Sequence, residues 1–255
     1  MTDKGRIRPT NEDCFAIQDE LGLCVVADGL GGHNAGEVAA RLAVDVVVDH
    51  VGETAELAAA RGPLDPDLWP FGFDPSLSVD GNLLRTAIHV ASMRIREAAF
   101  TSCDCAGMGT TLVAARVSAG RLSVAHVGDS RLYLLARRHL RQLTEDDSWM
   151  TSMLAHDPDA DPFLLQHHPM RSALTNVVGT RSRTEVHVVE QALAGGELLL
   201  LTTDGVHGVL DAARIEQVLL AESEPRAMAH TLISAALARG SRDNCTAVAA
   251  RYIKT

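Results

Sequence analysis

The sequence predicts an α+β fold in which antiparallel β-sheets and helices are stacked in layers. Short apolar runs rich in strand-forming residues, and longer runs with helical spacing, come in blocks along the chain. Blocks favour antiparallel sheets, because strict alternation of strand and helix is the pattern of a doubly wound parallel sheet. The 255 residues are 46% hydrophobic and 22% charged, so the chain can bury one substantial core. We therefore expect a single domain spanning residues 1–255.

The first two strands are predicted to form a hairpin. Cys14–Ile17 and Leu23–Ala27 are short apolar runs, separated by a polar connection that ends in glycine. Antiparallel pairing places Glu12 and Asp13, which precede the first strand, beside Asp28, which follows the second. Three carboxylates are therefore expected to converge at this end of the hairpin.

Two helices are predicted next in the chain. The first runs from Asn34 to about His50, and its apolar stripe consists of Val38, Leu42, Val46 and Val47. The second is expected over Asn82–Phe100. Between them, Gly62–Asp80 is rich in proline and aromatic residues, which predicts an ordered insertion over about residues 62–80.

The remainder of the chain is predicted to supply further strands and two more helices. The strands are Thr111–Val117, Leu122–Val127, Arg131–Leu135, Val186–Glu190, Glu197–Thr202 and Thr246–Tyr252. The helices are Ala212–Leu220, with Asp211 as its N-cap, and Pro225–Arg239.

The composition argues against several classes of protein. No apolar run approaches the ~20 residues that span a bilayer, and none follows the charged start, so we expect no membrane partner, no signal peptide and a cytoplasmic location. The five cysteines are scattered without paired spacing, which predicts reduced thiols. A formal charge of −10 disfavours nucleic acid, because phosphate-backbone binding needs a basic surface. An acidic chain that acts on phosphate must supply positive charge locally, and metal ions would do so.

Four aspartates occupy equivalent positions at the ends of predicted strands. Asp28, Asp129 and Asp204 follow apolar strands, and Asp243 precedes one. Antiparallel pairing would gather them at one rim with the carboxylates that precede the hairpin. Such carboxylates repel one another unless cations bind between them, and an all-oxygen set selects Mg²⁺ or Mn²⁺ over zinc. Any one Asp-Gly or Gly-Asp pair is more simply ordinary turn chemistry, but several of them beside apolar strands favour a metal site.

A set of short segments is together highly specific. They are Arg8-Pro-Thr-Asn-Glu-Asp13, Val26-Ala-Asp-Gly-Leu-Gly-Gly-His33 with Ala35-Gly-Glu37, Gly107-Met-Gly-Thr-Thr-Leu112, Ala125-His-Val-Gly-Asp-Ser-Arg131, Leu143-Thr-Glu-Asp146, Leu200-Leu-Thr-Thr-Asp-Gly205 and Asp243-Asn-Cys-Thr246. In these segments and their order the chain resembles the metal-dependent protein phosphatases of the PPM class (protein phosphatase type 2C), in their compact bacterial form. The resemblance implies a four-layer α-β-β-α sandwich with two central antiparallel β-sheets flanked by helices, and the metals at one end. It also implies one phosphatase catalytic domain with a variable flap over about residues 146–172.

The resemblance further implies the ligands of two core metal ions. Asp28 would bridge them, and the Gly29 carbonyl would bind one of them. The other ligands, mostly through waters, would be Glu12 or Asp13, Asp204 and Asp243. Asp129 matches a position associated with a third, weaker ion.

The implied reaction is hydrolysis of phosphoserine and phosphothreonine by a water or hydroxide that bridges two Mn²⁺ or Mg²⁺ ions. Arg8 matches the arginine that grips the substrate phosphate. His33 is a candidate for protonating the leaving oxygen, and it is equally suited to orienting the following helix. The chain departs from the family pattern at Asp147, where many relatives have histidine, and at Gly208, where some relatives place another carboxylate.

The implied partners are phosphoserine and phosphothreonine proteins of bacterial signal transduction, including substrates of a Ser/Thr kinase, and we expect a monomer. A catalytically weak pseudophosphatase that binds a phosphoprotein is the alternative, but every matched acid and Arg8 are present. A nucleotide or phosphodiester hydrolase is disfavoured because the chain has no GxxxxGK[ST] loop. A partner-binding role for Gly62–Asp80 is compatible with phosphatase activity.

Overall fold

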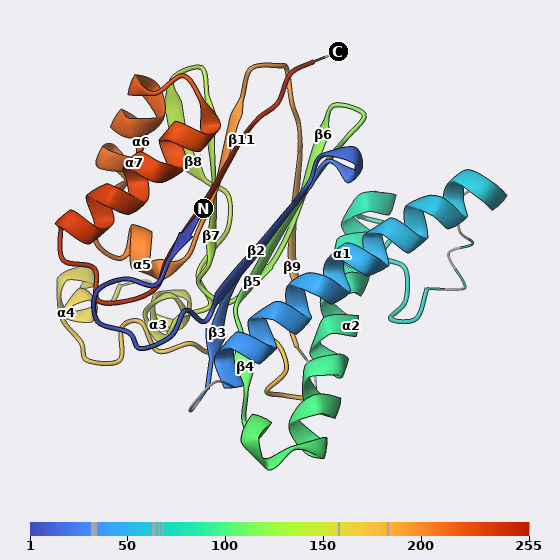
Figure 1. The fold of residues 1–255 in the computed structure, drawn as a ribbon, viewed down its shortest axis with the longest axis horizontal. Coiled ribbons are helices and arrows are strands. Elements are labelled where there is room, and N and C mark those ends of the chain that lie inside the picture. Colours follow the sequence, from blue (N-terminus) through green and yellow to red (C-terminus); the bar gives the residue numbers. More distant parts are fainter. Residues whose placement is uncertain are drawn as a thin grey trace.

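The computed structural model describes residues 1–31, 35–62, 65, 67, 69–157, 159–182 and 184–254. Two antiparallel sheets lie face to face at the centre, and helices cover both outer surfaces (Figure 1). This is the expected four-layer α-β-β-α sandwich. Among the described residues, no helix has the length and apolar character needed to cross a membrane.

The first sheet contains the predicted hairpin. Its strands, in the spatial order β2-β3-β5-β6-β9, are β2 (Asp13–Gln18), β3 (Leu23–Leu30), β5 (Leu112–Ser118), β6 (Arg121–Val127) and β9 (His187–Ala192). The short β4 (Gly109–Thr110) pairs with the end of β3. The outer face of this sheet is covered by α1 (Ala35–Arg61) and α2 (Val79–Thr101). The buried side chains of these helices form one core cluster with β3, β5 and β6.

The second sheet is formed mainly by the C-terminal half of the chain. Its spatial order is β1 (Thr2–Asp3), β11 (Cys245–Arg251), β10 (Leu198–Thr202), β7 (Arg131–Ala136) and β8 (His139–Gln142). On its outer face lie α6 (Ala212–Ala221) and α7 (Pro225–Ala238). The side chain of Asp211 accepts a hydrogen bond from the Arg214 N–H, so it caps α6 as predicted. A third cluster of buried side chains fills the space between the sheets.

The predicted apolar stripe of the first helix is wrong at Val38 but right at Val47, which is fully buried, and at Leu42 and Val46, which pack against the same core cluster. Val38 is 42% exposed, whereas the alanines Ala39, Ala40 and Ala43 are fully buried. The helix packs against both the sheet and α2, so small side chains occupy the crowded surface and allow a close approach. The helix also continues to Arg61 instead of ending near His50, because the residues after His50 are mostly good helix formers.

The part of the predicted insertion that the structure describes is packed against the core. The Trp69 ring is 8% exposed and meets Phe73 edge to face, with the ring centroids 5.6 Å apart. Both belong to the cluster under α1 and α2. The segment is therefore tied to the first sheet's outer layer.

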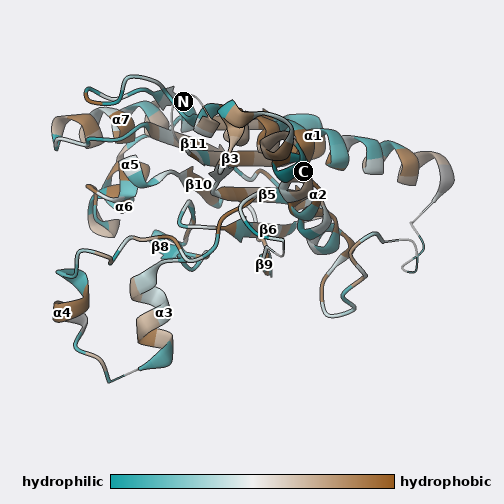
Figure 2. Ribbon diagram, turned by 90° about the horizontal axis from the view of Figure 1, so that it is seen from below, coloured by the Kyte–Doolittle hydropathy of each residue, from teal (hydrophilic) through white to brown (hydrophobic). Residues whose placement is uncertain are grey.

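The region expected to be a flap contains two helices that the sequence pattern did not predict, α3 (Trp149–His156) and α4 (Pro162–Gln166). We call residues 146–172 the flap. Both helices project from the body of the sandwich on one side (Figure 2). Trp149 stacks on His168 within the flap, with the ring centroids 4.3 Å apart.

Candidate active site

The hairpin brings its carboxylates together as expected. In the register of β2 and β3, Asp13 lies directly opposite Asp28. The Gly29 N–H donates a hydrogen bond to the Glu12 carbonyl over 3.1 Å. Asp28 lies within β3 and not after it, but the convergence of the three acids at this end of the sheet is confirmed.

The second sheet brings its acids to the same end of the sandwich. Asp204 is the first residue of the short helix α5 (Asp204–His207), directly after β10. Asp243 precedes β11, which pairs with β10 in antiparallel register. Asp129 lies in the turn between β6 and β7, so it joins the two sheets.

These residues surround one cavity of about 530 Å³. It is lined by Arg8, Pro9, Thr10, Glu12, Asp28, Gly29, Leu30, Gly31, Thr111, Asp129, Ser172, Leu174, Asp204, Asp243 and Asn244. The lining includes every predicted site residue except Asp13 and His33. His33 lies outside the described residues, so its predicted role stays a prediction. Thr111, Ser172, Leu174 and Asn244 were not predicted as site residues, although Thr111 and Asn244 lie in two of the segments that carry the family resemblance.

Asp13 lies behind the cavity wall. Its side chain is 8% exposed, and its Oδ2 accepts hydrogen bonds from the hydroxyls of Thr203, over 2.9 Å, and Thr246, over 2.7 Å. Both threonines belong to the second sheet's end of the site. Asp13 therefore ties β2 to that sheet, whereas Glu12 faces the cavity.

The close approach of these segments requires a glycine at one position. A Cβ on Gly205 would collide with the Asn244 carbonyl oxygen. The absence of a side chain lets α5 lie directly against the turn that carries Asp243, which keeps Asp204 and Asp243 at one cavity.

Burial and mutual repulsion raise the pKa values of the clustered acids. Burial, followed by the charges of Asp13 and Asp204, raises the pKa of Asp28 well above its usual range. Burial raises the pKa of Asp13 to about 7 despite its threonine hydrogen bonds, and burial with the Asp204 charge raises that of Asp129 to about 7. Burial and the Asp243 charge also raise the pKa of Asp204. Proteins place carboxylates this way where cations bind among them.

The residues present fit divalent metal ions held partly through water. Asp13 and Asp204 each have one buried carboxylate oxygen without a hydrogen-bond partner among the described residues. No three His, Cys, Asp or Glu side chains in the described part of the chain are arranged to hold an ion by themselves. Carboxylates around a cavity with room for water are instead the pattern that suits Mg²⁺ and Mn²⁺, which retain several waters.

Arg8 supplies a cation at the rim of this acidic cavity. Its Nη2 donates to Asp243 Oδ2 over 2.6 Å, and its side chain is 53% exposed. This hydrogen bond, together with the charges of Asp243, Asp28 and Glu12, raises the pKa of Arg8 above its ordinary value, although burial alone would lower it. A planar guanidinium in this position is suited to bind a phosphoryl group that enters the cavity.

The family model described as "Protein phosphatase 2C" matches residues 9–238. The chain is 34% identical over 248 residues to a serine/threonine phosphatase stp of Listeria monocytogenes, covering 96% of this chain and 91% of that protein. It is 33% identical to the serine/threonine protein phosphatase PstP of Mycobacterium tuberculosis, covering 99% of this chain and 44% of that protein.

Solved structures agree with the sequence comparisons. The M. tuberculosis phosphatase PstP/Ppp superposes with a TM-score of 0.82 at 29% identity, covering 100% of this chain and 97% of that one. A catalytic domain of PstP in complex with two manganese ions gives a TM-score of 0.79 at 27% identity, covering 100% and 96%. The family model matches most of the chain, and these relatives agree with it. The chain therefore belongs to the protein phosphatase 2C family.

Proposed function

We propose that the protein is a metal-dependent serine/threonine protein phosphatase, which hydrolyses phosphoserine and phosphothreonine in proteins. The observation that carries the proposal is the single cavity in which carboxylates from both sheets meet, with Arg8 at its rim. Membership of the protein phosphatase 2C family supports the same activity.

The residues that would hold two core Mn²⁺ or Mg²⁺ ions are the cavity-lining acids and one carbonyl: Glu12, Asp28, Gly29, Asp204 and Asp243. When bound, the ions supply positive charge to the phosphoryl oxygens and make water more acidic. Asp129 lines the same cavity and would contribute to a third, weaker site. Asp13 would act from behind the wall by holding β2 against Thr203 and Thr246.

Arg8 would bind and orient the substrate phosphate. Its exposed guanidinium is anchored on Asp243 and can donate further hydrogen bonds in one plane to phosphoryl oxygens. Holding the phosphate in a fixed orientation over the acidic cavity accounts for a large share of catalysis in phosphoryl transfer. We propose that His33 protonates the leaving oxygen, because an imidazole titrates in the range that this step needs.

We also propose that the substrates are phosphoproteins of a Ser/Thr kinase pathway, that the protein acts in the cytoplasm, and that it is a monomer. Bacterial relatives named as serine/threonine phosphatases support the substrate class. Light scattering at assay concentration tests the oligomeric state.

The decisive experiment is hydrolysis of a phosphothreonine peptide by the purified protein. Phosphate release should stop with EDTA and return with Mn²⁺ or Mg²⁺. The Asp243→Ala variant should remain inactive with metal, while Asp49→Asn, which changes an exposed carboxylate on α1, should match the wild type. Activity that persists in Asp243→Ala would refute the assignment of the site. A folded, metal-binding protein with no activity would favour the pseudophosphatase.

A further inference from the structure

Asp147 lies where the two arms of the flap meet the body of the protein. The Thr175 N–H donates to the Asp147 carbonyl over 2.9 Å, and the Trp149 N–H donates to the Ala173 carbonyl over 2.8 Å. Ser148 and Leu174 form a β-bridge between these bonds. We call residues 146–149 the outgoing arm of the flap and residues 172–175, at and just after its end, the returning arm. The two arms are therefore joined at Asp147 and the two residues that follow it.

The same residue is bound to the turn that carries Asp129. The Asp147 N–H donates to the Gly128 carbonyl over 3.0 Å, and the Gly128 N–H donates to Asp147 Oδ2 over 2.8 Å. Gly128 has a φ of +92°, a conformation that other residues rarely adopt. These two reciprocal bonds hold the turn immediately before Asp129.

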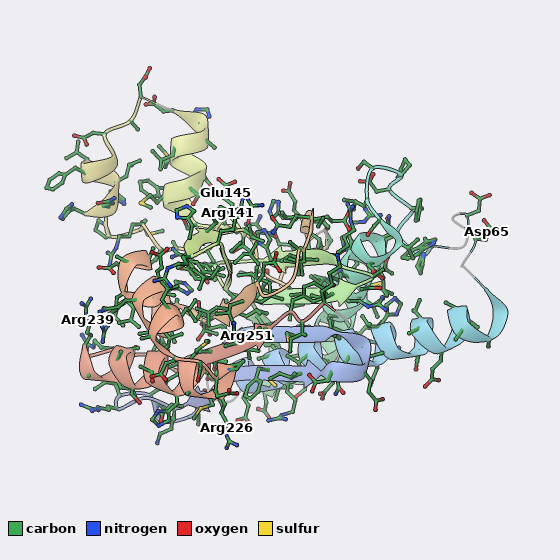
Figure 3. All side chains as sticks on the ribbon, turned by 90° about the horizontal axis from the view of Figure 1, so that it is seen from above. Asp65, Arg141, Glu145, Arg226, Arg239 and Arg251 are labelled. Atoms are coloured by element: carbon green, nitrogen blue, oxygen red, sulfur yellow. The ribbon has the colours of Figure 1, made fainter. Side chains whose placement is uncertain are left out.

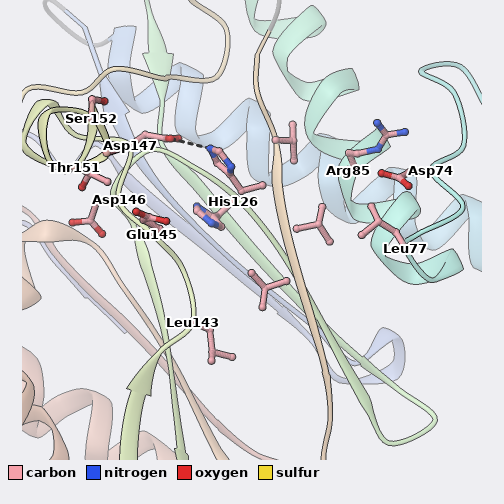
Figure 4. A pocket seen from close by; sticks show the side chains of 15 residues that line it. Asp74, Leu77, Arg85, His126, Leu143, Glu145, Asp146, Asp147, Thr151 and Ser152 are labelled. Atoms are coloured by element: carbon pink, nitrogen blue, oxygen red, sulfur yellow. Dashed lines mark hydrogen bonds and ion pairs between the residues drawn. The ribbon is translucent and has the colours of Figure 1, made fainter. Parts of the chain in front are cut away.

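Three groups orient the Asp147 carboxylate. Its Oδ1 is paired with His187 Nε2 at 3.0 Å (Figure 4), and its Oδ2 also accepts from Asn176 Nδ2 over 2.8 Å. His187 in turn stacks on the buried His126, with the ring centroids 5.1 Å apart. Burial alone would raise the pKa of Asp147, but the hydrogen bonds from His187, Gly128 and Asn176 outweigh it and lower the pKa. The carboxylate is thus ionised and fixed from both sides.

The bonds of Asp147 reach the candidate active site through two of its walls. Asp129 lines the cavity from the turn, and Ser172 and Leu174 line it from the returning arm of the flap. Asp147 itself is not among the lining residues. Any effect of this carboxylate on the reaction must therefore pass through the residues that it holds.

We infer that Asp147 is a positioning residue that locks the Asp129 turn and the returning arm of the flap into one arrangement at the cavity. The inference rests on the proposed function, and it assigns Asn176 and His187 as the groups that orient the carboxylate. A side chain that only stabilised the fold would affect the whole protein equally. A positioning residue would selectively affect the flap base, binding of the ion that Asp129 would help to hold, and substrate binding.

The test compares Asp147→Ala with Asp147→Asn. Asparagine retains an oxygen that accepts from both Gly128 and Asn176, whereas alanine removes the acceptor. The matched control is Glu145→Ala, because Glu145 is an exposed carboxylate close to the start of the flap (Figure 3). Should Asp147→Ala fail to fold, Asn176→Ala removes one of the two donors to Oδ2 and serves in its place.

Hydrogen exchange of the metal-free proteins gives a readout that does not depend on activity. In Asp147→Ala, the amides of Trp149 and Thr175 should exchange about tenfold faster, the change expected on losing a hydrogen bond to a charged group. Amides of the central strands should remain unchanged. Glu145→Ala should match the wild type within about twofold. Asp147→Asn should lie between the wild type and Asp147→Ala, because its neutral oxygen keeps the hydrogen bonds from Gly128 and Asn176 but loses the charge.

Mn²⁺ titration and kinetics complete the experiment. In Asp147→Ala, calorimetry should show about tenfold weaker binding of the weakest Mn²⁺, and the KM for a phosphothreonine peptide should rise by a similar factor. At saturating Mn²⁺, kcat should change by less than about twofold. Asp147→Asn should recover most of the loss in both Mn²⁺ binding and KM.

Several results would overturn the inference. One is an Asp147→Ala variant whose amide exchange and Mn²⁺ binding equal those of the wild type. Another is an Asp147→Ala variant whose amides exchange uniformly faster over the whole fold. The third is an Asp147→Asn variant as impaired as Asp147→Ala. If the wild type does not hydrolyse the peptide, the proposed function fails, but hydrogen exchange and Mn²⁺ binding still decide the role of Asp147.

Discussion

Replacing Asp129 by asparagine should stabilise the metal-free protein while weakening its function. Burial, then the charges of Asp204 and Asp146, raise the pKa of Asp129 to about 7. Above this pH the folded, metal-free protein must hold an ionised carboxylate that its surroundings disfavour. Asparagine has nearly the same shape and carries no charge, so the variant avoids this cost.

The magnitude follows from the difference between the folded and unfolded pKa values. The pKa of Asp129 rises from 3.8 to about 7, and at about 1.4 kcal/mol for each pH unit the cost is at most about 4 kcal/mol. Water that enters the cavity reduces it, so we expect a gain of about 2–4 kcal/mol at pH 8, or roughly 5–15 °C in Tm. Because the folded pKa lies above the unfolded value, the wild type loses this stability as pH rises from about 4 through about 7.

Thermal unfolding in EDTA at pH 5, 6.5 and 8 measures the effect, with Asp49→Asn as the control for losing an exposed carboxylate. The Tm of Asp129→Asn should exceed that of the wild type by a margin that grows with pH. Added Mn²⁺ should narrow the margin, since the ion binds the wild type more strongly. A metal-free Asp129→Asn that is no more stable at pH 8 than the wild type would refute the reasoning.

Three further predictions concern other parts of the structure. Arg8→Ala should raise KM for a phosphopeptide about tenfold or more with a smaller fall in kcat, and Arg8→Lys should recover only part of this, as initial-rate kinetics can show. Burial would raise the pKa of Glu190, but hydrogen bonds from two serines lower it to about 2. Glu190→Gln should therefore lose about 1–2 kcal/mol in urea unfolding at pH 7, and the loss should fade as pH falls from about 4.5 towards 2. Gly205→Ala should destabilise by about 3 kcal/mol and displace Asp204, because its Cβ would collide with the Asn244 carbonyl, and a wild-type Tm would contradict this.

The hairpin and its acids were predictable because the information is local. Alternating strand-forming residues on either side of a short connection define β2 and β3, and antiparallel register alone brings Asp13 opposite Asp28. The edge strand β8 (His139–Gln142) was missed because its sequence is mostly polar and exposed. Its pairing with β7 is visible only once the sheet is formed.

The role of Asp147 was not predictable for a different reason. The sequence marked it as a departure from the family pattern, but its partners lie far along the chain. Gly128 precedes it by 19 residues and His187 follows it by 40. No period or motif links such positions, so only the packing of the flap base against β9 and the Asp129 turn shows what the carboxylate does.

The site is divided between the two sheets, and this has a consequence for its stability. Asp28 belongs to the first sheet and Asp204 follows a strand of the second, so the distance between them depends on the packing of the buried cluster between the sheets. The hydrogen bonds from Thr203 and Thr246 to Asp13 cross the same boundary. Repulsion among the acids acts against this packing when no cation is bound. Under the proposed assignment, metal ions held by acids of both sheets would stabilise the contact between the sheets as well as offset the repulsion, and this would couple formation of the active site to closure of the sandwich.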